Sequence, residues 1–135
     1  IKVPALLDGL QTKLFDRVEQ VRLTKANPAK AGVWSLGHQL GALKSSLRLN
    51  YFGPYTLGYA TGDKEFAAKT TVDLTLGYAV TESFDVTLGA SNLFDVYPDE
   101  QPVVNSFNGI FKYPNTNAPF GFNGGSYYLD LTYKF

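Results

Sequence analysis

The sequence of 135 residues lacks cysteine and methionine and contains one histidine, His38. Without cysteine, a disulfide scaffold, a thiolate metal site and a cysteine nucleophile are all excluded. A single histidine cannot form a two-histidine metal site, and no orienting partner for a general base is apparent, so we expect neither role for His38. Because no methionine marks a translation start, we expect the chain to be part of a longer polypeptide.

A charge excess of one sign and long apolar runs are also absent. Twelve basic and twelve acidic residues give a formal net charge of zero, so no basic field would attract nucleic acid. No stretch approaches the roughly 18 apolar residues of a membrane helix, which excludes a helical span but not a β-barrel span. No glycine-rich phosphate loop occurs, and the acidic residues are spread over separate segments, so we expect no enzyme activity and no cofactor.

The sequence is rich in alternation of apolar and polar residues. Five segments show it, at 33–40, 43–52, 70–80, 84–95 and 127–135. A period of two is typical of strands with one apolar and one polar face. His38 falls on the apolar positions, where we expect it to face lipid as a neutral imidazole. The charged residues fall only on the polar positions, at Lys44, Arg48, Asp73, Asp85, Asp95, Asp130 and Lys134. The pattern predicts an all-β fold with one face free of formal charge.

The lengths of the strands and of their connections favour a membrane barrel. The segments run over about 8–14 residues, against about 5–6 for an average strand. Ten tilted residues rise about 25 Å, which matches the lipid-facing band of an outer-membrane barrel. The connections alternate between short ("GA", "TES") and long ("YATGDKEFA", 98–124), as expected for tight periplasmic turns and long outer loops. Pro54 is expected to mark the exit of a strand from this band, or a bulge.

Five strands cannot close a barrel, because about eight is the smallest number that does so. We therefore expect either several copies to assemble or the chain to supply the last strands of a longer barrel. In residues 1–30, Leu10, Leu14, Val18 and Val21 are spaced by three and four before a stop at Asn27-Pro28. A short helix, an irregular loop and a strand pair all remain open there. We assign 1–30 to an extracellular loop segment and 31–135 to the barrel.

Several motifs resemble one known family. "GASNLFDVYPDE", a long loop and then "PFGFNGGSYYLDLTYKF" resemble the C-terminal end of a TonB-dependent outer-membrane receptor, and "LFDRVEQVRLTKANP" and "LRLNYFG" resemble stretches shortly before it. The most specific part of the motif comprises Asn92, Leu93, Phe94, Asp95, Tyr97 and Pro98. The resemblance implies the last five strands of a 22-stranded barrel in the Gram-negative outer membrane, whose plug domain and TonB-contacting segment lie upstream.

The same resemblance implies a function and a set of partners. These receptors import a scarce nutrient, such as a siderophore, cobalamin or a sugar, with energy supplied through TonB acting on the plug. The expected partners are outer-membrane lipid, TonB, the nutrient and the barrel-assembly machinery. That machinery is expected to recognise a C-terminal signal formed by Leu129, Leu131, Tyr133 and Phe135.

Three groups of residues are candidate sites. The first is expected to face the lumen, where its members pair across strands or with the plug rather than form a substrate channel; it comprises Lys44, Arg48, Asn50, Asp73, Asp85, Asp130 and Lys134. The second is an outer loop with aromatic and amide side chains suited to a bulky nutrient, although a packed lid is an equal alternative; it comprises Phe107, Asn108, Phe111, Tyr113, Asn115, Asn117 and Phe120. The third, Asp95, Asp99 and Glu100, has the oxygen ligands that calcium prefers, but acidic loop residues are more often simply solvated.

Two other functions remain open. A passive outer-membrane porin, or a barrel subunit of a larger assembly, would show the same strands but lack the plug. A soluble β-domain that binds a small ligand, such as a sandwich or a lipocalin-like fold, would have shorter strands. Its apolar face would be covered by a second sheet or closed around the ligand.

Overall fold

The structure is a computed structural model that describes residues 15–114 and 118–135. The chain divides into two compact units. The helix–hairpin unit comprises residues 1–30, 53–68 and 98–120, and the sheet unit comprises residues 31–52, 69–97 and 121–135. Each unit is therefore built from segments that are distant in the sequence.

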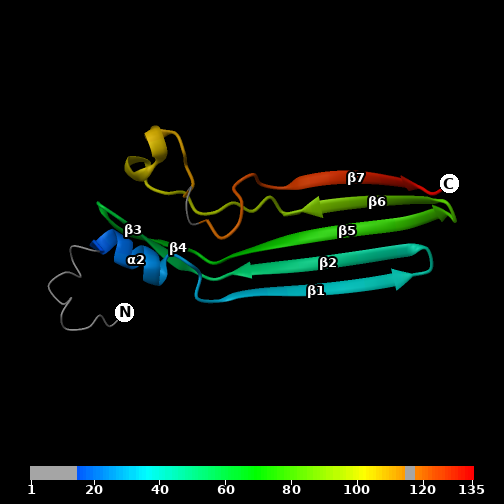
Figure 1. Ribbon diagram of the computed structural model, residues 1–135, viewed down its shortest axis with the longest axis horizontal. Coiled ribbons are helices and arrows are strands. Elements are labelled where there is room, and N and C mark those ends of the chain that lie inside the picture. Colours follow the sequence, from blue (N-terminus) through cyan, green and yellow to red (C-terminus); the bar gives the residue numbers. More distant parts are fainter. Residues whose placement is uncertain (1–14, 115–117) are drawn as a thin grey trace. The chain divides into compact units, whose positions relative to one another are not determined.

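The sheet unit contains five antiparallel strands in the order β1–β2–β5–β6–β7, which lie side by side in Figure 1. Their bounds are β1 Ala31–Leu40, β2 Leu43–Phe52, β5 Lys69–Thr81, β6 Phe84–Ser91 and β7 Ser126–Tyr133. The prediction of an all-β fold with five antiparallel strands is confirmed. With 10, 10, 13, 8 and 8 residues, these strands exceed the average length of about 5–6 residues.

The two tight turns of the sheet follow from local sequence. Gly41, in the turn between β1 and β2, has φ +56°, a left-handed conformation that glycine adopts without steric cost and that two-residue hairpin turns require. The turn between β5 and β6 is accompanied by a shift of register between Ala79 and Thr81. Both turns were predicted as short connections, and both are.

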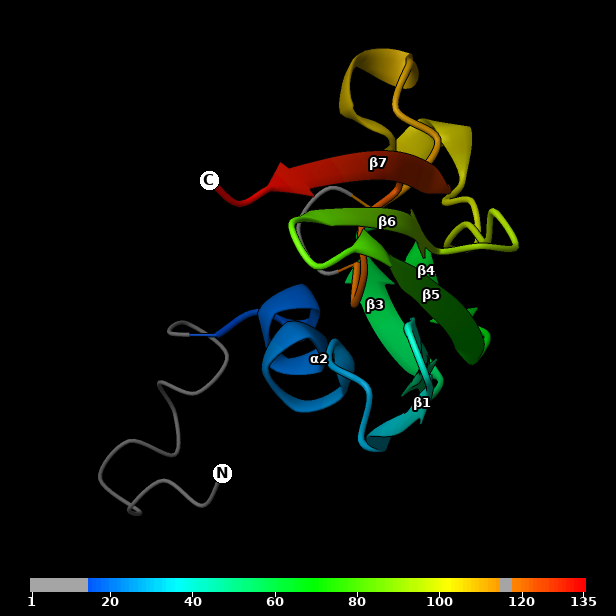
Figure 2. The same cartoon turned by 90° about the vertical axis from the view of Figure 1, so that its right-hand side faces the viewer.

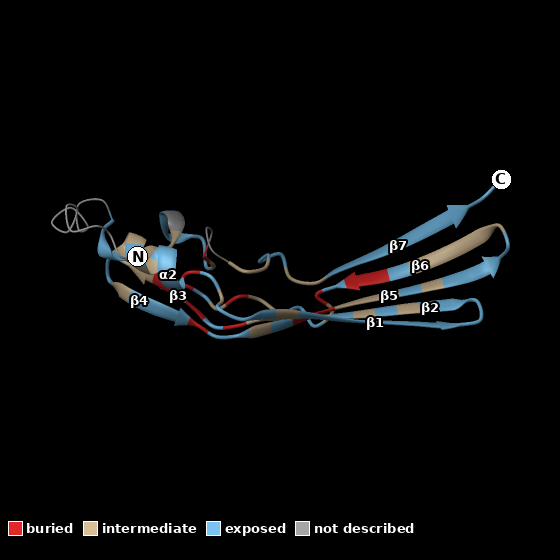
Figure 3. Ribbon diagram, turned by 60° about the horizontal axis from the view of Figure 1, so that its bottom comes forward, coloured by how far each residue is buried: buried red, intermediate tan, exposed pale blue. Residues whose placement is uncertain are grey.

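The sheet is open. The strands at its two edges, β1 and β7, each pair with one neighbour only within the described residues, so no closed barrel forms within this chain. No second layer of helices or strands covers either face among the described residues of this unit. Most of the strand residues are consequently exposed or half-buried (Figure 3). The 22-stranded barrel stays a prediction.

The segment predicted as the first long loop contains a second, smaller sheet. Its strands β3 (Tyr55–Tyr59) and β4 (Gly62–Phe66) pair as an antiparallel hairpin, with Tyr55 opposite Phe66. Gly62 has φ +137° at the turn. The predicted long connection over about residues 59–67 therefore includes most of a hairpin that the sequence pattern did not reveal, and Pro54 follows the end of β2 as predicted.

The fourth predicted strand is shorter than its letter pattern. Alternation continues through Asp95, but β6 ends at Ser91 because Asn92 and Asp95 have φ +51° and +55°. Strand residues need strongly negative φ, and asparagine and aspartate are among the few non-glycine residues that tolerate the left-handed region. Asp95 is therefore not a strand residue of the polar face, which corrects its predicted position.

The helix–hairpin unit contains one α-helix, α2 (Arg17–Lys25). It begins after Asp16, whose carboxylate accepts a hydrogen bond from the backbone N–H of Glu19 at 2.8 Å, which satisfies one of the free donors of the first turn. Of the alternatives left open for residues 1–30, the helix is therefore present over this stretch, while Leu10 and Leu14 lie outside the described residues. No helix among the described residues has the length and apolar character needed to cross a membrane.

The helix packs beside β3, as Figure 2 shows. Gly58 allows this close approach, because a Cβ added there would lie only 3.0–3.3 Å from atoms of Val18 and Val21. The small core of the unit comprises Ala26, Tyr55, Leu57 and Phe66, with Tyr59 packed against it. A salt bridge between Arg17 and Asp63 joins the start of the helix to the hairpin.

Candidate functional site

The apolar side chains of the sheet form continuous rows across the strands. In one row Leu36, Leu47, Leu74, Ala90 and Tyr127 are successive register partners. The two ends of the row are exposed, Leu36 by 67% and Tyr127 by 70%, whereas Leu47 and Leu74 are half-buried and Ala90 is buried. No charged residue occupies this face in the five described strands. We call it the leucine face, after the leucines that share it with Leu36, Leu47 and Leu74. The predicted separation of apolar and charged residues therefore holds across the whole width of the sheet.

A neighbouring row contains the single histidine of the chain. His38 is followed across the sheet by Ser45, Leu76, Leu88 and Leu129. The histidine thus lies on the leucine face, in the position that the sequence pattern predicts. Among the described residues, no cluster of three or more histidine, cysteine, aspartate or glutamate side chains is arranged for a metal ion.

The residues of the predicted C-terminal signal lie on the same leucine face. Leu129, Leu131 and Tyr133 alternate along the edge strand β7, and Phe135 follows the end of the strand. The rings of Tyr133 and Phe135 meet edge to face, with centroids 5.3 Å apart. Leu129, Leu131 and Tyr133 are about three-fifths exposed, at 60%, 58% and 61%. The aromatic end of the chain is thus presented to the surroundings and not to a protein core.

The residues predicted to face the lumen lie on the opposite face or next to its end. Lys44, Arg48, Asn50, Asp73, Asp85 and Asp130 are strand residues of that face, and Lys134 follows β7, with its backbone N–H bonded to the carbonyl of Ser83. Arg48, Asn50 and Asp73 lie together in one cluster, and Asp85 and Lys134 in a second. Lys44 and Asp130 share one cross-strand row. That a lumen exists stays a prediction.

Asp73 is the centre of the first polar cluster. Its Oδ2 accepts a hydrogen bond from Asn50 Nδ2 at 2.9 Å. Its Oδ1 accepts from Ser91 Oγ at 3.1 Å and from the backbone N–H of Asn92 at 2.9 Å. Arg48 is the register partner of Asp73 on β2. One carboxylate thus connects β2, β5 and the end of β6.

The second cluster lies at the other end of the sheet. Lys134 Nζ and Asp85 Oδ2 form an exposed salt bridge at 3.1 Å. Lys44 and Asp130 belong to one cross-strand row, but β5 and β6 separate them. Exposed pairs contribute about 0–1 kcal/mol. We therefore expect the hydrogen-bonded Asp73 cluster to contribute more to stability than this salt bridge.

Tyr128 makes a contact on the polar face that the sequence did not reveal. Its ring lies across its register partner Gly89, so that a Cβ added to Gly89 would be 1.9 Å from Tyr128 Cζ. The hydroxyl of Tyr128 is 3.5 Å from Thr75 Oγ1 on the strand beyond. Aromatic side chains commonly cover a strand glycine in this way.

The motif after β6 that resembles the receptor family forms a turn, which the side chain of Asn92 closes by bonding to Val96. Asn92 Nδ2 donates to the carbonyl of Val96 at 2.8 Å, and Asn92 Oδ1 accepts from the N–H of Val96 at 3.0 Å. The backbone N–H of Leu93 still bonds to the carbonyl of Val72 at 2.7 Å. Phe94 is 70% exposed, whereas Asn92 is buried. The asparagine therefore shapes the backbone at the end of the strand.

Asp95 then connects this turn to the start of β7. Its Oδ1 accepts a hydrogen bond from the backbone N–H of Gly125 at 2.7 Å. Gly124 has φ +73°, and a Cβ there would lie 2.3 Å from the hydroxyl of Tyr97. Tyr97, Gly124 and Gly125 therefore pack together with Asp95 at the start of β7. Pro98, the last motif residue, is buried in the helix–hairpin unit.

The predicted outer loop is organised by a residue that no sequence signal marked, Gln101. Its Nε2 donates to the carbonyls of Phe111 and Tyr113 at 3.0 and 2.9 Å, and its Oε1 accepts from the hydroxyl of Tyr59 at 3.2 Å. The loop contains two short 3₁₀ helices, η2 (Val103–Asn105) and η3 (Phe107–Gly109). Phe107 and Asn108 lie in η3, Phe120 lies near the end of the loop, and Asn115 and Asn117 lie outside the described residues.

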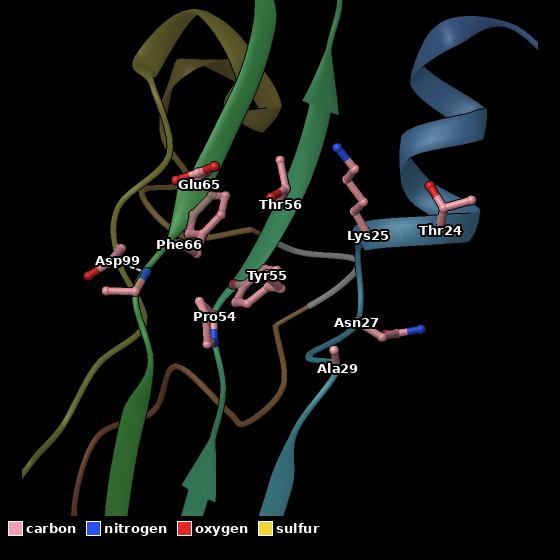
Figure 4. A pocket seen from close by; sticks show the side chains of 11 residues that line it. Thr24, Lys25, Asn27, Ala29, Pro54, Tyr55, Thr56, Glu65, Phe66 and Asp99 are labelled. Atoms are coloured by element: carbon pink, nitrogen blue, oxygen red, sulfur yellow. Dashed lines mark hydrogen bonds between the residues drawn. The ribbon is translucent and has the colours of Figure 1, made fainter.

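Of that predicted ligand set, Asn108, Phe111, Tyr113 and Phe120 do not line the cavity of the unit. The cavity, of about 540 Å³, lies next to the end of α2 and the base of the β3–β4 hairpin (Figure 4). It is lined by Thr24, Lys25, Asn27, Ala29, Pro54, Tyr55, Thr56, Glu65, Phe66, Ala67 and Asp99. Most of these residues lie in residues 1–30 or in the predicted long connections, where no binding site other than the calcium candidate Asp99 was predicted among them, so sequence reasoning missed the cavity.

The acidic residues considered for calcium have separate contacts. Asp95 binds Gly125 in the sheet unit. In the helix–hairpin unit, Asp99 Oδ2 accepts from the backbone N–H of Ala67 at 2.6 Å, and Glu100 forms an exposed salt bridge with Lys112 at 3.6 Å. The three carboxylates therefore act as separate hydrogen-bond acceptors and ion-pair partners.

Burial also perturbs two tyrosines of the helix–hairpin unit. Burial raises the pKa of Tyr55 to about 12, with smaller contributions from the nearby Tyr59 and the Asp99 carboxylate. Burial likewise raises the pKa of Tyr59. Both hydroxyls are therefore neutral at physiological pH.

Comparison of the chain with protein-family models, with curated proteins and with solved structures finds no match in any of the three.

Proposed function

We propose that the sheet unit is the C-terminal part of the barrel of a TonB-dependent outer-membrane receptor, which imports a scarce nutrient such as a siderophore, cobalamin or a sugar. The observation that best supports this proposal is the contrast between the two faces of one open sheet. One face presents exposed leucine and aromatic rows without a charge, and the other presents the Asp73 cluster and the Lys134–Asp85 pair. Lipid outside and a polar lumen inside require this arrangement.

The edges of the sheet also support the proposal. An edge strand in lipid leaves backbone N–H and C=O groups without partners, each at a cost of several kcal/mol. β1 and β7 therefore need further strands, as a longer barrel would supply. A soluble sandwich, by contrast, would cover its apolar face with a second layer, and the described residues of the sheet unit contain none.

The partners follow from the same proposal. Lipid contacts the leucine face, and the barrel-assembly machinery recognises β7 through Leu129, Leu131, Tyr133 and Phe135. TonB acts through a plug outside this chain. The proposal rests on the motif residues and the two faces of the sheet, and the specific nutrient is left open.

Two adjacent residues of β6 provide a direct test. Leu88 lies on the leucine face and Thr87 on the polar face, and the chain has no cysteine. Leu88→Cys and Thr87→Cys variants of the full-length protein, in a background without other cysteines, are labelled with an environment-sensitive fluorophore and reconstituted with brominated lipids. We expect strong quenching at position 88 and weak quenching at 87. Equal quenching at both positions would refute the membrane assignment.

A lysine scan at the same pair tests the energetics. Leu88→Lys should destabilise the reconstituted protein by about 2–4 kcal/mol, the cost of a lysine on the lipid face near the bilayer midplane. Thr87→Lys serves as the control and should change stability by less than about 0.5 kcal/mol. The TonB-dependent part is tested by binding of the purified full-length protein to the periplasmic domain of TonB, which a passive porin would not show.

A further inference from the structure

Tyr55, which lines the cavity of the helix–hairpin unit, has a hydroxyl group whose hydrogen bond is missing. Tyr55 is 6% exposed, and its Oη has no hydrogen-bond partner among the described residues. Tyr59, four residues further along β3 and on the same face, binds Gln101 through its hydroxyl. Folded proteins rarely leave a buried polar atom unpaired, because the lost hydrogen bonds to water are not replaced. The exception at Tyr55 therefore needs an explanation.

The ring of Tyr55 is firmly placed. It stacks on Phe66, its register partner, with centroids 4.8 Å apart and planes inclined by 9°. Phe66 is itself 1% exposed. The two rings form an apolar part of the cavity wall and fix the direction of the hydroxyl. A phenylalanine at position 55 would fill the same space, so packing alone does not call for tyrosine.

The cavity lining includes polar groups and charges of both signs. The Asp99 carboxylate is close enough to contribute to the raised pKa of Tyr55 and accepts a hydrogen bond from the N–H of Ala67 at 2.6 Å. A carboxylate offers about four acceptor sites, so it can receive a further donor. Lys25 and Glu65 add one charge of each sign to the wall. Hydroxyl and amide groups come from Thr24, Thr56 and Asn27.

This combination selects one kind of ligand. An anion such as phosphate would meet two carboxylates, and a cation would meet Lys25. A ligand hydroxyl, by contrast, can accept from Tyr55 and donate to Asp99 at the same time, because a hydroxyl is both donor and acceptor. The volume of about 540 Å³ lies within the range of about 300–1,000 Å³ typical of small-molecule sites.

We propose that this cavity binds a neutral polyhydroxylated molecule, such as one or two sugar rings, through a hydroxyl that bridges Tyr55 Oη and the Asp99 carboxylate. The Tyr55 oxygen is buried in this structure, so the atoms around it have to shift before a ligand can bond to it. Lys25 and Glu65 are exposed members of the wall with long side chains. The proposal uses only the helix–hairpin unit and does not require the sheet to lie in a membrane.

The test uses the full-length protein and defined sugars as probes. Saturation-transfer NMR is recorded with glucose, galactose, mannose and N-acetylglucosamine, and with gluconate and glucosamine as charged comparisons. We expect at least one of the four neutral sugars to bind more tightly than both charged ones. Tyr55→Phe should weaken that binding about tenfold, the loss expected for one hydrogen bond. Tyr59→Phe, which removes a hydroxyl outside the cavity lining, is the matched control and should bind as the wild type does.

Stability in the absence of sugar separates a ligand contact from a structural one. Because Tyr55 Oη has no protein partner, Tyr55→Phe should melt at the same temperature as the wild type or higher. A lower melting temperature would show that this hydroxyl already contributes to the stability of the sugar-free protein, and would overturn the proposal. The proposal is equally overturned if none of the four neutral sugars binds at millimolar concentration, if a charged comparison binds best, or if Tyr55→Phe binds sugar as well as the wild type.

Discussion

Replacement of Gly89 by alanine should destabilise the sheet, although the same change normally stabilises a strand. Glycine in the middle of a strand costs roughly 0.5–1 kcal/mol relative to alanine, because more backbone freedom is lost on folding. At position 89, however, the new methyl group would lie 1.9 Å from Tyr128 Cζ and 2.4 Å from its hydroxyl. Carbon atoms in contact are normally about 3.5–4.0 Å apart, so the ring has to leave its place.

The size of the effect follows from two opposing contributions. Overpacking of this kind costs about 1–3 kcal/mol, which includes the lost cross-strand contact between Tyr128 and its neighbours. The gain from alanine offsets roughly 0.5–1 kcal/mol of that cost. We therefore expect Gly89→Ala to lower the free energy of unfolding by up to about 2.5 kcal/mol. In the Tyr128→Ala background the clash is absent, and Gly89→Ala should stabilise the sheet.

Gly77 provides a matched control in the adjacent strand. It lies on the same polar face, but a Cβ there would meet its nearest neighbour, Thr87 Oγ1, at an ordinary 3.6 Å. Gly77→Ala should therefore raise stability by roughly 0.5–1 kcal/mol. Unfolding of the purified full-length protein by urea, followed by circular dichroism, measures all four variants. If Gly89→Ala has the same effect with and without the Tyr128 ring, the contact does not have the energetic role assigned here.

Three further predictions use the same protein. Asp73→Ala should lower the free energy of unfolding by about 1–3 kcal/mol, because three donors lose their acceptor. Asp85→Ala breaks one exposed salt bridge and should cost at most about 1 kcal/mol. Equal losses in urea titrations would contradict the expected difference between the two aspartates. Asp95→Ala should speed hydrogen exchange at the amide of Gly125, and unchanged exchange would mean that another group protects it. The stabilisation linked to Tyr55 should be complete below pH 10 and be lost as pH rises toward 12, because the pKa in the folded protein exceeds the unfolded value of 10.0. Tyr55→Phe should remove this component of the pH dependence of the melting temperature. If the variant keeps the pH dependence of the wild type, the linkage to Tyr55 is refuted.

The strands of the sheet were predictable because alternation is a local property repeated many times. Each strand signals its two faces independently, and a shift of register by one residue would invert a whole face. Leu36, Leu47 and Leu74 could therefore be placed on one face before their pairing was known. The exact partners, such as Gly89 with Tyr128, depend on register between segments 39 positions apart in the sequence, and periodicity does not contain that information.

The errors arose where side chains and backbone conformation override periodicity. The letters alternate through Asp95, yet Asn92 bends the backbone and bonds to Val96, which ends the strand. In the β3–β4 hairpin, Tyr55, Leu57 and Tyr59 have the apolar spacing of a strand. Both strands have only five residues, however, and β3 follows a proline, so the hairpin was not predicted. The cavity was not foreseeable, because it depends on how the helix and the hairpin pack.

The pairing of β2 with β5 has a consequence for how this chain can change during evolution. Phe52 and Lys69 are register partners, so the ends of the segment between them lie only about 4.5–5.5 Å apart. A tight turn could close that gap, and the ladder would not need to shift. Residues 53–68 therefore form an exchangeable insertion: they can lengthen, shorten or acquire new binding chemistry while the sheet keeps its register.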